Sequence, residues 1–278
     1  EGLFDGLAVN AVINSAEARL AGRKLEDLRL TLEGRANAQS PQGTVAATGT
    51  LDGQPLRINA DLVSSVGSTR APDIAVEVGP NRLTGSLAFS PQFMPEGTVQ
   101  FQFPDVSLLA ALAAQQAEGD LAGTITFINE NGRTAARIEA SGSPISRAPV
   151  TIAEPAVNLV VPPITQLAAD GTVRAARIEA GAAAITALDL QFDHGGNTTR
   201  VDLDAQYDNA PLTALASIRT GEELAIALDS FSAAPRNIPI RLASPTTVVV
   251  ENGTARLSDL TLATGNGEIR VSGSARTM

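Results

Sequence analysis

The sequence predicts an all-β protein with one short helix near residues 105–116, whose strands form either one elongated, curled antiparallel sheet with a hydrophobic groove or two packed sheets. Apolar and polar residues alternate with a period of two in one segment after another, which is typical of strands that bury one side only. Short segments rich in glycine, proline, asparagine and aspartate separate these strands and favour tight turns. Only 3% of the 278 residues are aromatic, so the apolar surface of the strands is mainly aliphatic.

The first part of the chain contains the most regular alternation. We expect successive strands at residues 7–13, 24–34, 43–51, 55–62, 73–78 and 82–89. The fourth is as strict as any in the chain, because Leu56, Ile58, Ala60 and Leu62 alternate with polar or charged residues. Asp52 and Gly53 precede it and predict a hairpin turn, since glycine accepts a positive φ without steric cost.

A strand–helix–strand passage follows. Phe101 and Phe103 alternate with glutamines in a strand predicted at 97–103, and Asp105 comes directly after the proline that ends it. A carboxylate at this place can accept hydrogen bonds from the free N–H groups of a helix N-terminus. Residues 106–116 are rich in leucine, alanine and glutamine, which predicts about three turns of helix.

The predicted helix carries three leucines that need an apolar contact, Leu108, Leu109 and Leu112. We expect this helix to lie over the mouth of the groove or to plug one part of it. The alternation resumes directly afterwards in a strand at 121–127, which contains Ile125 and Phe127.

The second half of the chain returns to strands and turns. Strands are expected at 134–140, 150–152, 156–161, 187–193, 200–207 and 223–230, with three more in 247–273. Prolines are frequent in residues 143–164, and we expect the path of the sheet to change there, because proline cannot donate to a neighbouring strand. Since apolar alternation continues through this interval, we expect residues 1–278 to form a single elongated β-groove segment of a larger protein.

Charge and cysteine content exclude several classes of function. The net charge is −10, so we expect no nucleic-acid partner and no docking on anionic lipid headgroups. The chain has no cysteine, which excludes disulfides, thiolate metal sites and cysteine nucleophiles. The longest apolar helical stretch, around 108–114, is far shorter than the roughly 20 residues that cross a bilayer, so we expect any membrane anchor outside this segment.

No pattern of residues indicates catalysis, a cofactor or a bound metal, and we expect the protein not to be an enzyme. His194 is the only histidine and is expected in a hairpin turn with an exposed imidazole, without a second histidine or cysteine to help hold a metal. Asp202 and Asp204 share the polar side of one strand. This pattern is compatible with a calcium site or a pair of glycosidase acids, but it is more typical of a solvated strand.

The sequence feature that bears on function is shared by many strands, since one side of each is mainly aliphatic. One interpretation is a closed β-sandwich or β-solenoid with a structural or adhesive role and no lipid cargo. The other is a groove that binds lipid or β-strand cargo, since soluble monomers normally avoid a large continuous apolar surface. The residues expected to line such a groove are Leu56, Ile58, Leu62, Phe101, Phe103, Ile125, Phe127, Leu188, Leu190, Phe192, Val201, Leu203, Leu224, Ile226 and Leu228.

Three passages resemble recurring units of the TamB family of translocation and assembly module subunits, within the AsmA-like and bridge-like lipid transfer proteins. The first is GTVQFQFPDVSLLA, which begins at Gly97, followed by GDLAGTITF from Gly119. The second, ATGTLDGQPLRINA from Ala47, is similar to a hairpin of the family. The third, VENGTARLSDLTL from Val250 with GNGEIRVSG from Gly265, is similar to its terminal β-meander.

This resemblance implies an elongated periplasmic β-groove, or β-taco, in a protein anchored in the inner membrane. It implies an outer-membrane partner of the Omp85 class, similar to TamA. The implied role is to carry phospholipid between the inner and outer membranes, to support the assembly of outer-membrane proteins such as autotransporters, or both. The cargo in the groove would then be phospholipid acyl chains or a nascent outer-membrane protein.

Overall fold

The computed structural model describes residues 7–36, 42–65, 68–92, 94–112, 115–130, 133–162, 168–221, 223–251, 253–265 and 267–276. Strands dominate these residues and pair antiparallel, so the predicted all-β, antiparallel class is confirmed. The chain divides into two compact units, Glu1–Arg147 and Ala148–Met278. This boundary falls inside the proline-rich interval 143–164, and the continuity of the whole chain as one segment stays a prediction.

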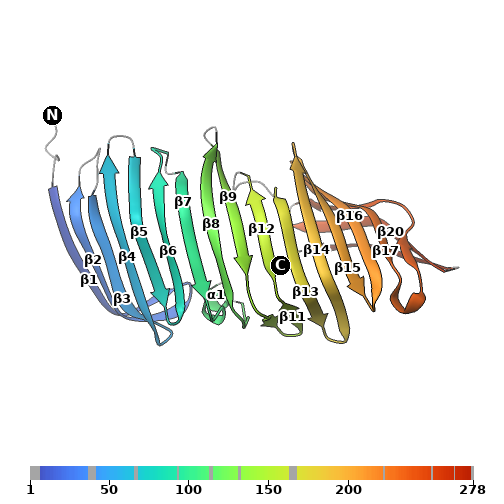
Figure 1. Ribbon diagram of the computed structural model, residues 1–278, viewed down its shortest axis with the longest axis horizontal. Coiled ribbons are helices and arrows are strands. Elements are labelled where there is room, and N and C mark those ends of the chain that lie inside the picture. Colours follow the sequence, from blue (N-terminus) through green and yellow to red (C-terminus); the bar gives the residue numbers. More distant parts are fainter. Residues whose placement is uncertain are drawn as a thin grey trace. The chain divides into compact units, whose positions relative to one another are not determined.

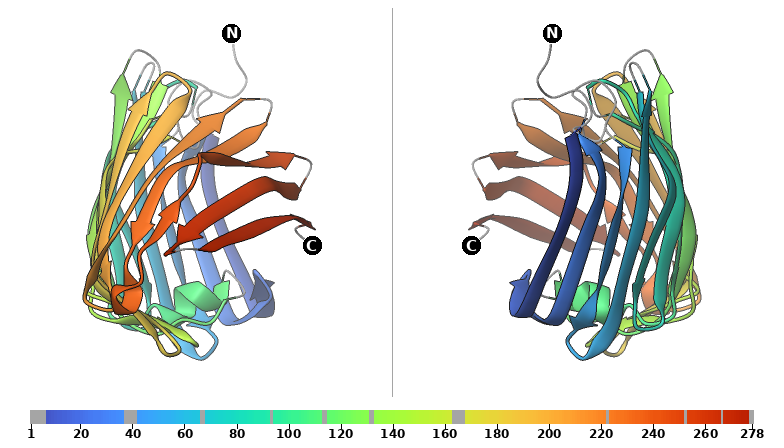
Figure 2. Two further views of the ribbon diagram at one scale, coloured as in Figure 1. Left: turned by 90° about the vertical axis from the view of Figure 1, so that its right-hand side faces the viewer. Right: turned by 90° about the vertical axis from the view of Figure 1, so that its left-hand side faces the viewer.

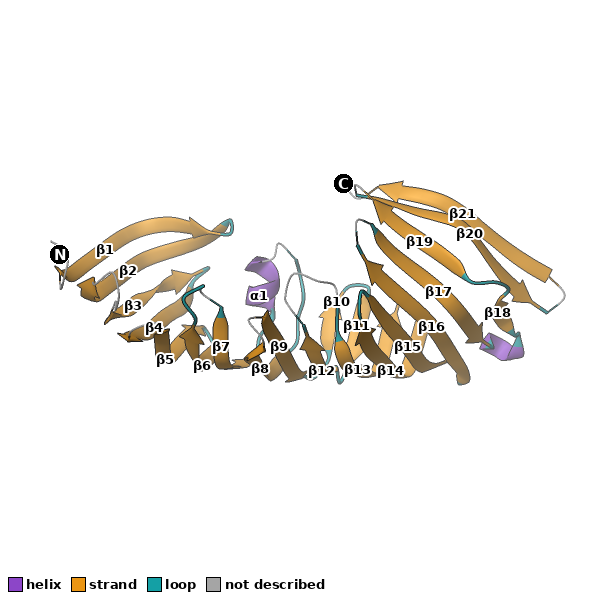
Figure 3. Cartoon of the chain, turned by 90° about the horizontal axis from the view of Figure 1, so that it is seen from above, coloured by secondary structure: helices purple, strands orange, loops and turns teal. Residues whose placement is uncertain are grey.

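The first unit is a β-meander. Its strands are β1 (Leu7–Leu20), β2 (Arg23–Ala36), β3 (Gln42–Leu51), β4 (Gln54–Ser65), β5 (Ser68–Val78), β6 (Asn81–Phe89), β7 (Pro95–Phe103), β8 (Leu121–Glu130), β9 (Arg133–Ser141) and β10 (Ile145–Arg147). From β1 to β9 each strand pairs with the next one in the chain (Figure 1). Figures 2 and 3 show this sheet curving along its width, with the only α-helix of the described residues on its inner side.

Several strands are longer than their alternation predicts. The strand expected at residues 7–13 continues to Leu20, because Ser15 and Glu17 still lie opposite residues of β2. A β-bulge interrupts β2 near Asp27, which has a φ of +49°, and the register with β3 shifts there. Such interruptions break the period of two in the sequence, whereas the backbone pairing continues across them.

The turn predicted between β3 and β4 is confirmed. Asp52 and Gly53 have φ values of +50° and +78°, which is the pair of positive values that a type I′ hairpin requires. The Asp52 carboxylate also accepts hydrogen bonds from the Lys24 backbone N–H, at 3.1 Å, and from the guanidinium of Arg23. These contacts attach the turn to the start of β2.

The predicted helix is present but shorter than expected. Helix α1 spans Ser107–Leu112, whereas the composition predicted 106–116. Residues 113–114 lie outside the described residues, and Gln115 to Ala117 are not helical. The chain has rejoined the sheet by Glu118, which forms a two-way backbone bridge with Ser146.

The second unit is also a meander, interrupted at two places by proline. Its strands are β11 (Val150–Ala153), β12 (Ala156–Val161), β13 (Asp170–Ala180), β14 (Ala183–Gly195), β15 (Thr198–Tyr207), β16 (Ala210–Thr220), β17 (Leu224–Ala233), β18 (Ile240–Leu242), β19 (Thr246–Glu251), β20 (Thr254–Thr264) and β21 (Gly267–Arg276). The short strands β11 and β12 both pair with β13, and Pro155 separates them. In the same way β18 and β19 both pair with β17 and β20, on either side of Pro245.

Candidate functional site

In the first unit the strand register brings the predicted groove residues to one face. Residues directly opposite each other in an antiparallel pair project to the same side of a sheet. Ile58 on β4 lies opposite Val76 on β5, which lies opposite Leu83 on β6, and Leu83 lies opposite Phe101 on β7. Continued through β8, these pairs define the apolar face of unit 1, which carries Leu56, Ile58, Leu62, Phe101, Phe103, Ile125 and Phe127.

The same holds within the second unit. Leu190 on β14 lies opposite Leu203 on β15, and Phe192 lies opposite Val201. Val201 lies opposite Ala216 on β16, which in turn lies opposite Leu228 on β17. These pairs define the apolar face of unit 2, which carries Leu188, Leu190, Phe192, Val201, Leu203, Leu224, Ile226 and Leu228.

One aromatic residue of this second face was missed by the alternation. Phe231 lies three residues after Leu228, so a strict period of two assigns it to the polar side. A bulge between Leu215 and Ala216 shifts the register, and Phe231 then faces Ala214 on the apolar side. The only signal in the sequence was the three-residue spacing between Leu228 and Phe231, which does not fit a period of two.

Among the strands that the structure describes, none forms a second sheet over either face within its own unit, and much of each face stays exposed. Leu56 and Phe101 are buried at 6% and 7% exposure, but Ile226 is 37% exposed and most of the predicted residues are only half-buried. The accessible surface of the chain is 17269 Å². Two separate compact domains that share this mass would expose about 13,600 Å². The difference is what single-layer sheets produce, because a strand in one layer buries its apolar side only against its neighbours.

Helix α1 covers one end of the apolar face of unit 1. Leu112 packs against a cluster of three buried leucines, Leu25, Leu51 and Leu56. Leu109 is 38% exposed, and Leu108 is half-buried. Of the three leucines proposed to plug the groove, Leu112 is thus the one packed on this cluster.

The start of α1 is fixed to the sheet by Asn81, the first residue of β6, which is only 4% exposed. Its amide donates to the Asp105 carbonyl at 2.8 Å, and its side-chain oxygen accepts from the Asp105 N–H at 3.1 Å. The Asp105 carboxylate accepts from the Ser107 N–H at 2.9 Å, as expected for a helix cap. Hydrogen bonds from the side chain and backbone of Ser107 lower the pKa of Asp105 below its ordinary value.

The segment after α1 is fixed in a similar way. The Val106 N–H donates to the Gly119 carbonyl at 3.0 Å, which closes the base of the segment. The Asp120 carboxylate accepts from the Ser143 backbone N–H at 3.2 Å and from its hydroxyl, and these bonds lower the pKa of Asp120. The helix therefore has anchors on both sides of its sequence.

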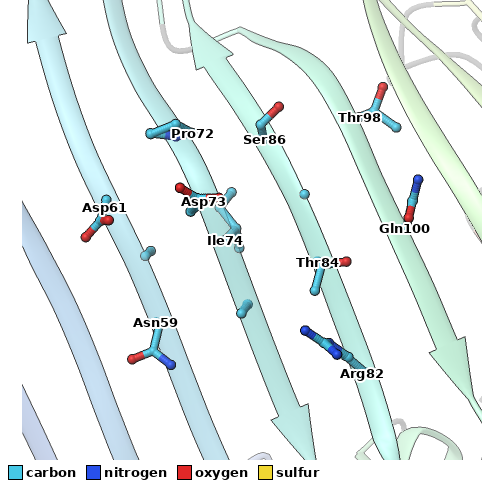
Figure 4. A pocket seen from close by; sticks show the side chains of 13 residues that line it. Asn59, Asp61, Pro72, Asp73, Ile74, Arg82, Thr84, Ser86, Thr98 and Gln100 are labelled. Carbon is cyan, nitrogen blue, oxygen red and sulfur yellow. The ribbon is translucent and has the colours of Figure 1, made fainter.

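The opposite, polar face of unit 1 contains a hollow of about 500 Å³ (Figure 4). Its centre is a cross-strand row in which the short Ala75 and Thr84 lie between the longer Asn59 and Gln100. Amide, hydroxyl and carboxylate groups line it, together with the exposed Arg82. The hollow follows from side-chain length on a solvated face, and its residues do not form a nucleophile–base arrangement.

The titratable residues singled out from the sequence have structural roles. The expectation of an exposed His194 in a turn is wrong: this residue lies in β14, is half-buried, and has Nδ1 3.0 Å from the hydroxyl of Thr199. The turn comes after it. Asp202 and Asp204 are exposed on the polar side of β15. Among the described residues, no group of three or more histidine, cysteine or acidic side chains could hold a metal ion.

No helix within the described part of the chain is both long and apolar enough to cross a membrane. A comparison of the chain with models of known protein families, with curated proteins and with solved structures gave no match.

Proposed function

We propose that this chain is a binding and conduit segment that shields phospholipid acyl chains from water on the apolar faces of its two sheets. The observation that carries this proposal is that each unit collects its predicted aliphatic and aromatic residues on one face, over which the described residues place no second sheet. A monomer with a closed core would bury such a face. An uncovered one is typical of a surface that binds an apolar ligand or partner.

The energetics favour an acyl chain as the ligand. Each methylene group moved from water to an aliphatic surface contributes about 0.8 kcal/mol, so a tail that lies along several strands is held by the sum of many small contacts. The faces are mainly aliphatic and offer few polar groups that would fix a ligand at one position. Such a surface suits movement along the sheet better than tight binding at a single site.

The sequence resemblance extends this proposal to a biological setting. A TamB-like segment would lie in the periplasm, in a protein anchored in the inner membrane, and would work with an Omp85-class partner similar to TamA. It would carry phospholipid between the two membranes, support the assembly of outer-membrane proteins such as autotransporters, or do both. A nascent amphipathic β-strand is chemically compatible with the same faces, since it also presents apolar side chains on one side.

Native mass spectrometry of the whole chain, purified without detergent, tests the proposal. We expect phospholipid to co-purify with the protein. Leu203→Glu places a charge on the apolar face of unit 2, and we expect it to lower the amount of bound lipid. Gln206→Glu is the matched control, because it adds the same charge on the polar side of the same strand. A protein free of lipid, which a photoreactive phospholipid also fails to label, contradicts the proposal.

A further inference from the structure

A small apolar recess lies in the apolar face of unit 1, near one end of strands β1 to β4. Its volume is about 180 Å³. The register explains its position, because Val9, Gly34, Gly43 and Leu62 lie directly opposite one another, strand by strand, in a single row. The two central residues have no side chain. The row is therefore low in the middle and bounded by Val9 at one end and Leu62 at the other.

The recess cannot be closed by substituting its own glycines. A Cβ on Gly34 would lie 2.2 Å from the Gln42 carbonyl oxygen, and a Cβ on Gly43 would lie 2.5 Å from that of Glu33. Both contacts are with backbone, which cannot move aside without breaking the sheet. The close approach of β2 and β3 thus requires glycine at both positions, and two facing glycines leave open space above them.

Side chains fill the space at other glycines of this face: an added Cβ would lie 2.7 Å from Phe101 Cζ at Gly123 and 3.1 Å from Val99 Cγ2 at Gly85. Gly123 lies opposite Phe101, and Gly97 lies opposite Phe127. Among the paired residues that the structure describes, Gly34 and Gly43 alone face each other. The row of Gly34 and Gly43 is open, whereas Phe101 and Val99 occupy the space at Gly123 and Gly85.

We propose that this recess is a seat for a segment of a single saturated acyl chain. The next row of the sheet supplies its side wall with Leu32 and Val45. The other lining residues, Glu33, Arg35, Gln42 and Thr44, alternate with these along β2 and β3, so their side chains project to the polar side of the sheet and the recess itself is aliphatic. An apolar cavity of about 150 Å³ accepts benzene, so the recess is large enough for a segment of roughly six carbons. A folded partner or a second copy would need about 800 Å² of interface, far more than this row supplies. An alkyl chain is the ligand that fills it without bringing a polar group.

This inference rests on the proposed function and gives it a defined site. Acyl chains that move along the face would bind at the row of Val9, Gly34, Gly43 and Leu62. The pair of Phe101 and Gly123 in the same face shows how the recess can be filled. Leu62 faces Gly43 as Phe101 faces Gly123, so Leu62→Phe is expected to place a ring over Gly43 without disturbing the sheet. Leu87→Phe is the matched control, because Leu87 faces Gly97 on the same apolar side, away from the recess.

The experiment uses the whole chain and phosphatidylcholine vesicles that contain a phosphatidylcholine with a photoreactive acyl chain, with peptide mapping of the adducts. We expect label on the peptides that contain Val9 and Leu62. Leu62→Phe should reduce this label about tenfold, which corresponds to roughly two methylene groups that lose their apolar contact. Leu87→Phe should leave it in place. Circular dichroism melting of each variant checks that the sheet is folded.

The possible failures are distinguishable. If the apolar faces are labelled but the peptides of Val9 and Leu62 are not, the seat is overturned and the proposed function stands. An equal loss of label at these peptides in both variants also overturns the seat. If no part of either apolar face is labelled in the unmodified chain, the proposed function itself fails.

Discussion

The ring of Phe101 on β7 lies over Gly123 on β8. The two residues are directly opposite in the strand register, and a Cβ added to Gly123 would lie 2.7 Å from Cζ of the ring. Phe101 also stacks on Phe103, with ring centroids 5.0 Å apart. Phe101 is consequently 7% exposed although the described strands of its unit form no second sheet over it. The glycine provides the space in which the aromatic side chain is buried.

Gly123→Ala is expected to destabilise the first unit by about 1–3 kcal/mol. The added methyl group would meet the Phe101 ring and, at 2.2 Å, the Glu139 carbonyl oxygen, so a ring rotation alone cannot relieve the contact. Thermal unfolding followed by circular dichroism measures the loss. Gly195→Ala is the control, because nothing lies within 4 Å of its added Cβ and its φ is not positive. Equal melting temperatures for the two variants would contradict this account.

Asn81→Ala should loosen the attachment of α1. It removes two hydrogen bonds to the backbone of Asp105 at a position that is 4% exposed, and a buried polar group left without its partner costs about 1–3 kcal/mol. Hydrogen exchange of the amides of residues 105–112 should become faster. Asn59→Ala, at an exposed position on the polar face, is expected to leave this exchange unchanged. Unaltered exchange in the first variant would show that Asn81 does not hold the helix.

Leu112→Ala should detach the last turn of α1 from the three-leucine cluster. The expected cost is about 1–2 kcal/mol, because this leucine is only partly buried. Exchange of the Ala110 amide, which donates to the Val106 carbonyl at 2.9 Å, reports the change. Leu109→Ala on the same helix is expected to change stability by less than about 0.5 kcal/mol, since Leu109 is exposed. If Leu109→Ala destabilised the protein more than Leu112→Ala, then Leu109 and not Leu112 would be the leucine that packs against the sheet.

The cap of α1 should depend on pH. Because hydrogen bonds lower the pKa of Asp105 in the folded protein, its carboxylate contributes stability above the ordinary pKa of about 3.9. This contribution is lost as the pH falls from there through the lowered value. Asp105→Ala should therefore melt about 2–4 °C below the unmodified protein at pH 6, and the difference should narrow below about pH 4. A difference in melting temperature that stays constant from pH 6 to pH 3 would show that the ionised Asp105 carboxylate does not stabilise the cap.

Alternation in the sequence identified most strands and the side of each that is apolar. The segment with Leu56, Ile58 and Leu62 illustrates why: each apolar residue reports the direction of its own side chain, and that direction depends only on the local extended backbone. The turn at Asp52 and Gly53 was predictable for the same reason, since its requirement for positive φ is local. Strand ends were less predictable, because β1 extends through polar residues that only its pairing with β2 keeps extended.

The sequence by itself therefore determined the all-β class, the apolar and polar sides of the strands and the site of the helix. The tertiary structure alone decided which residues meet across strands. It turned Phe231 to the apolar face through a bulge, bridged Glu118 to Ser146 soon after α1, and set Gly34 opposite Gly43. The physical reason is register: the period of two is a property of one strand, whereas a register shift belongs to a pair of strands distant in sequence.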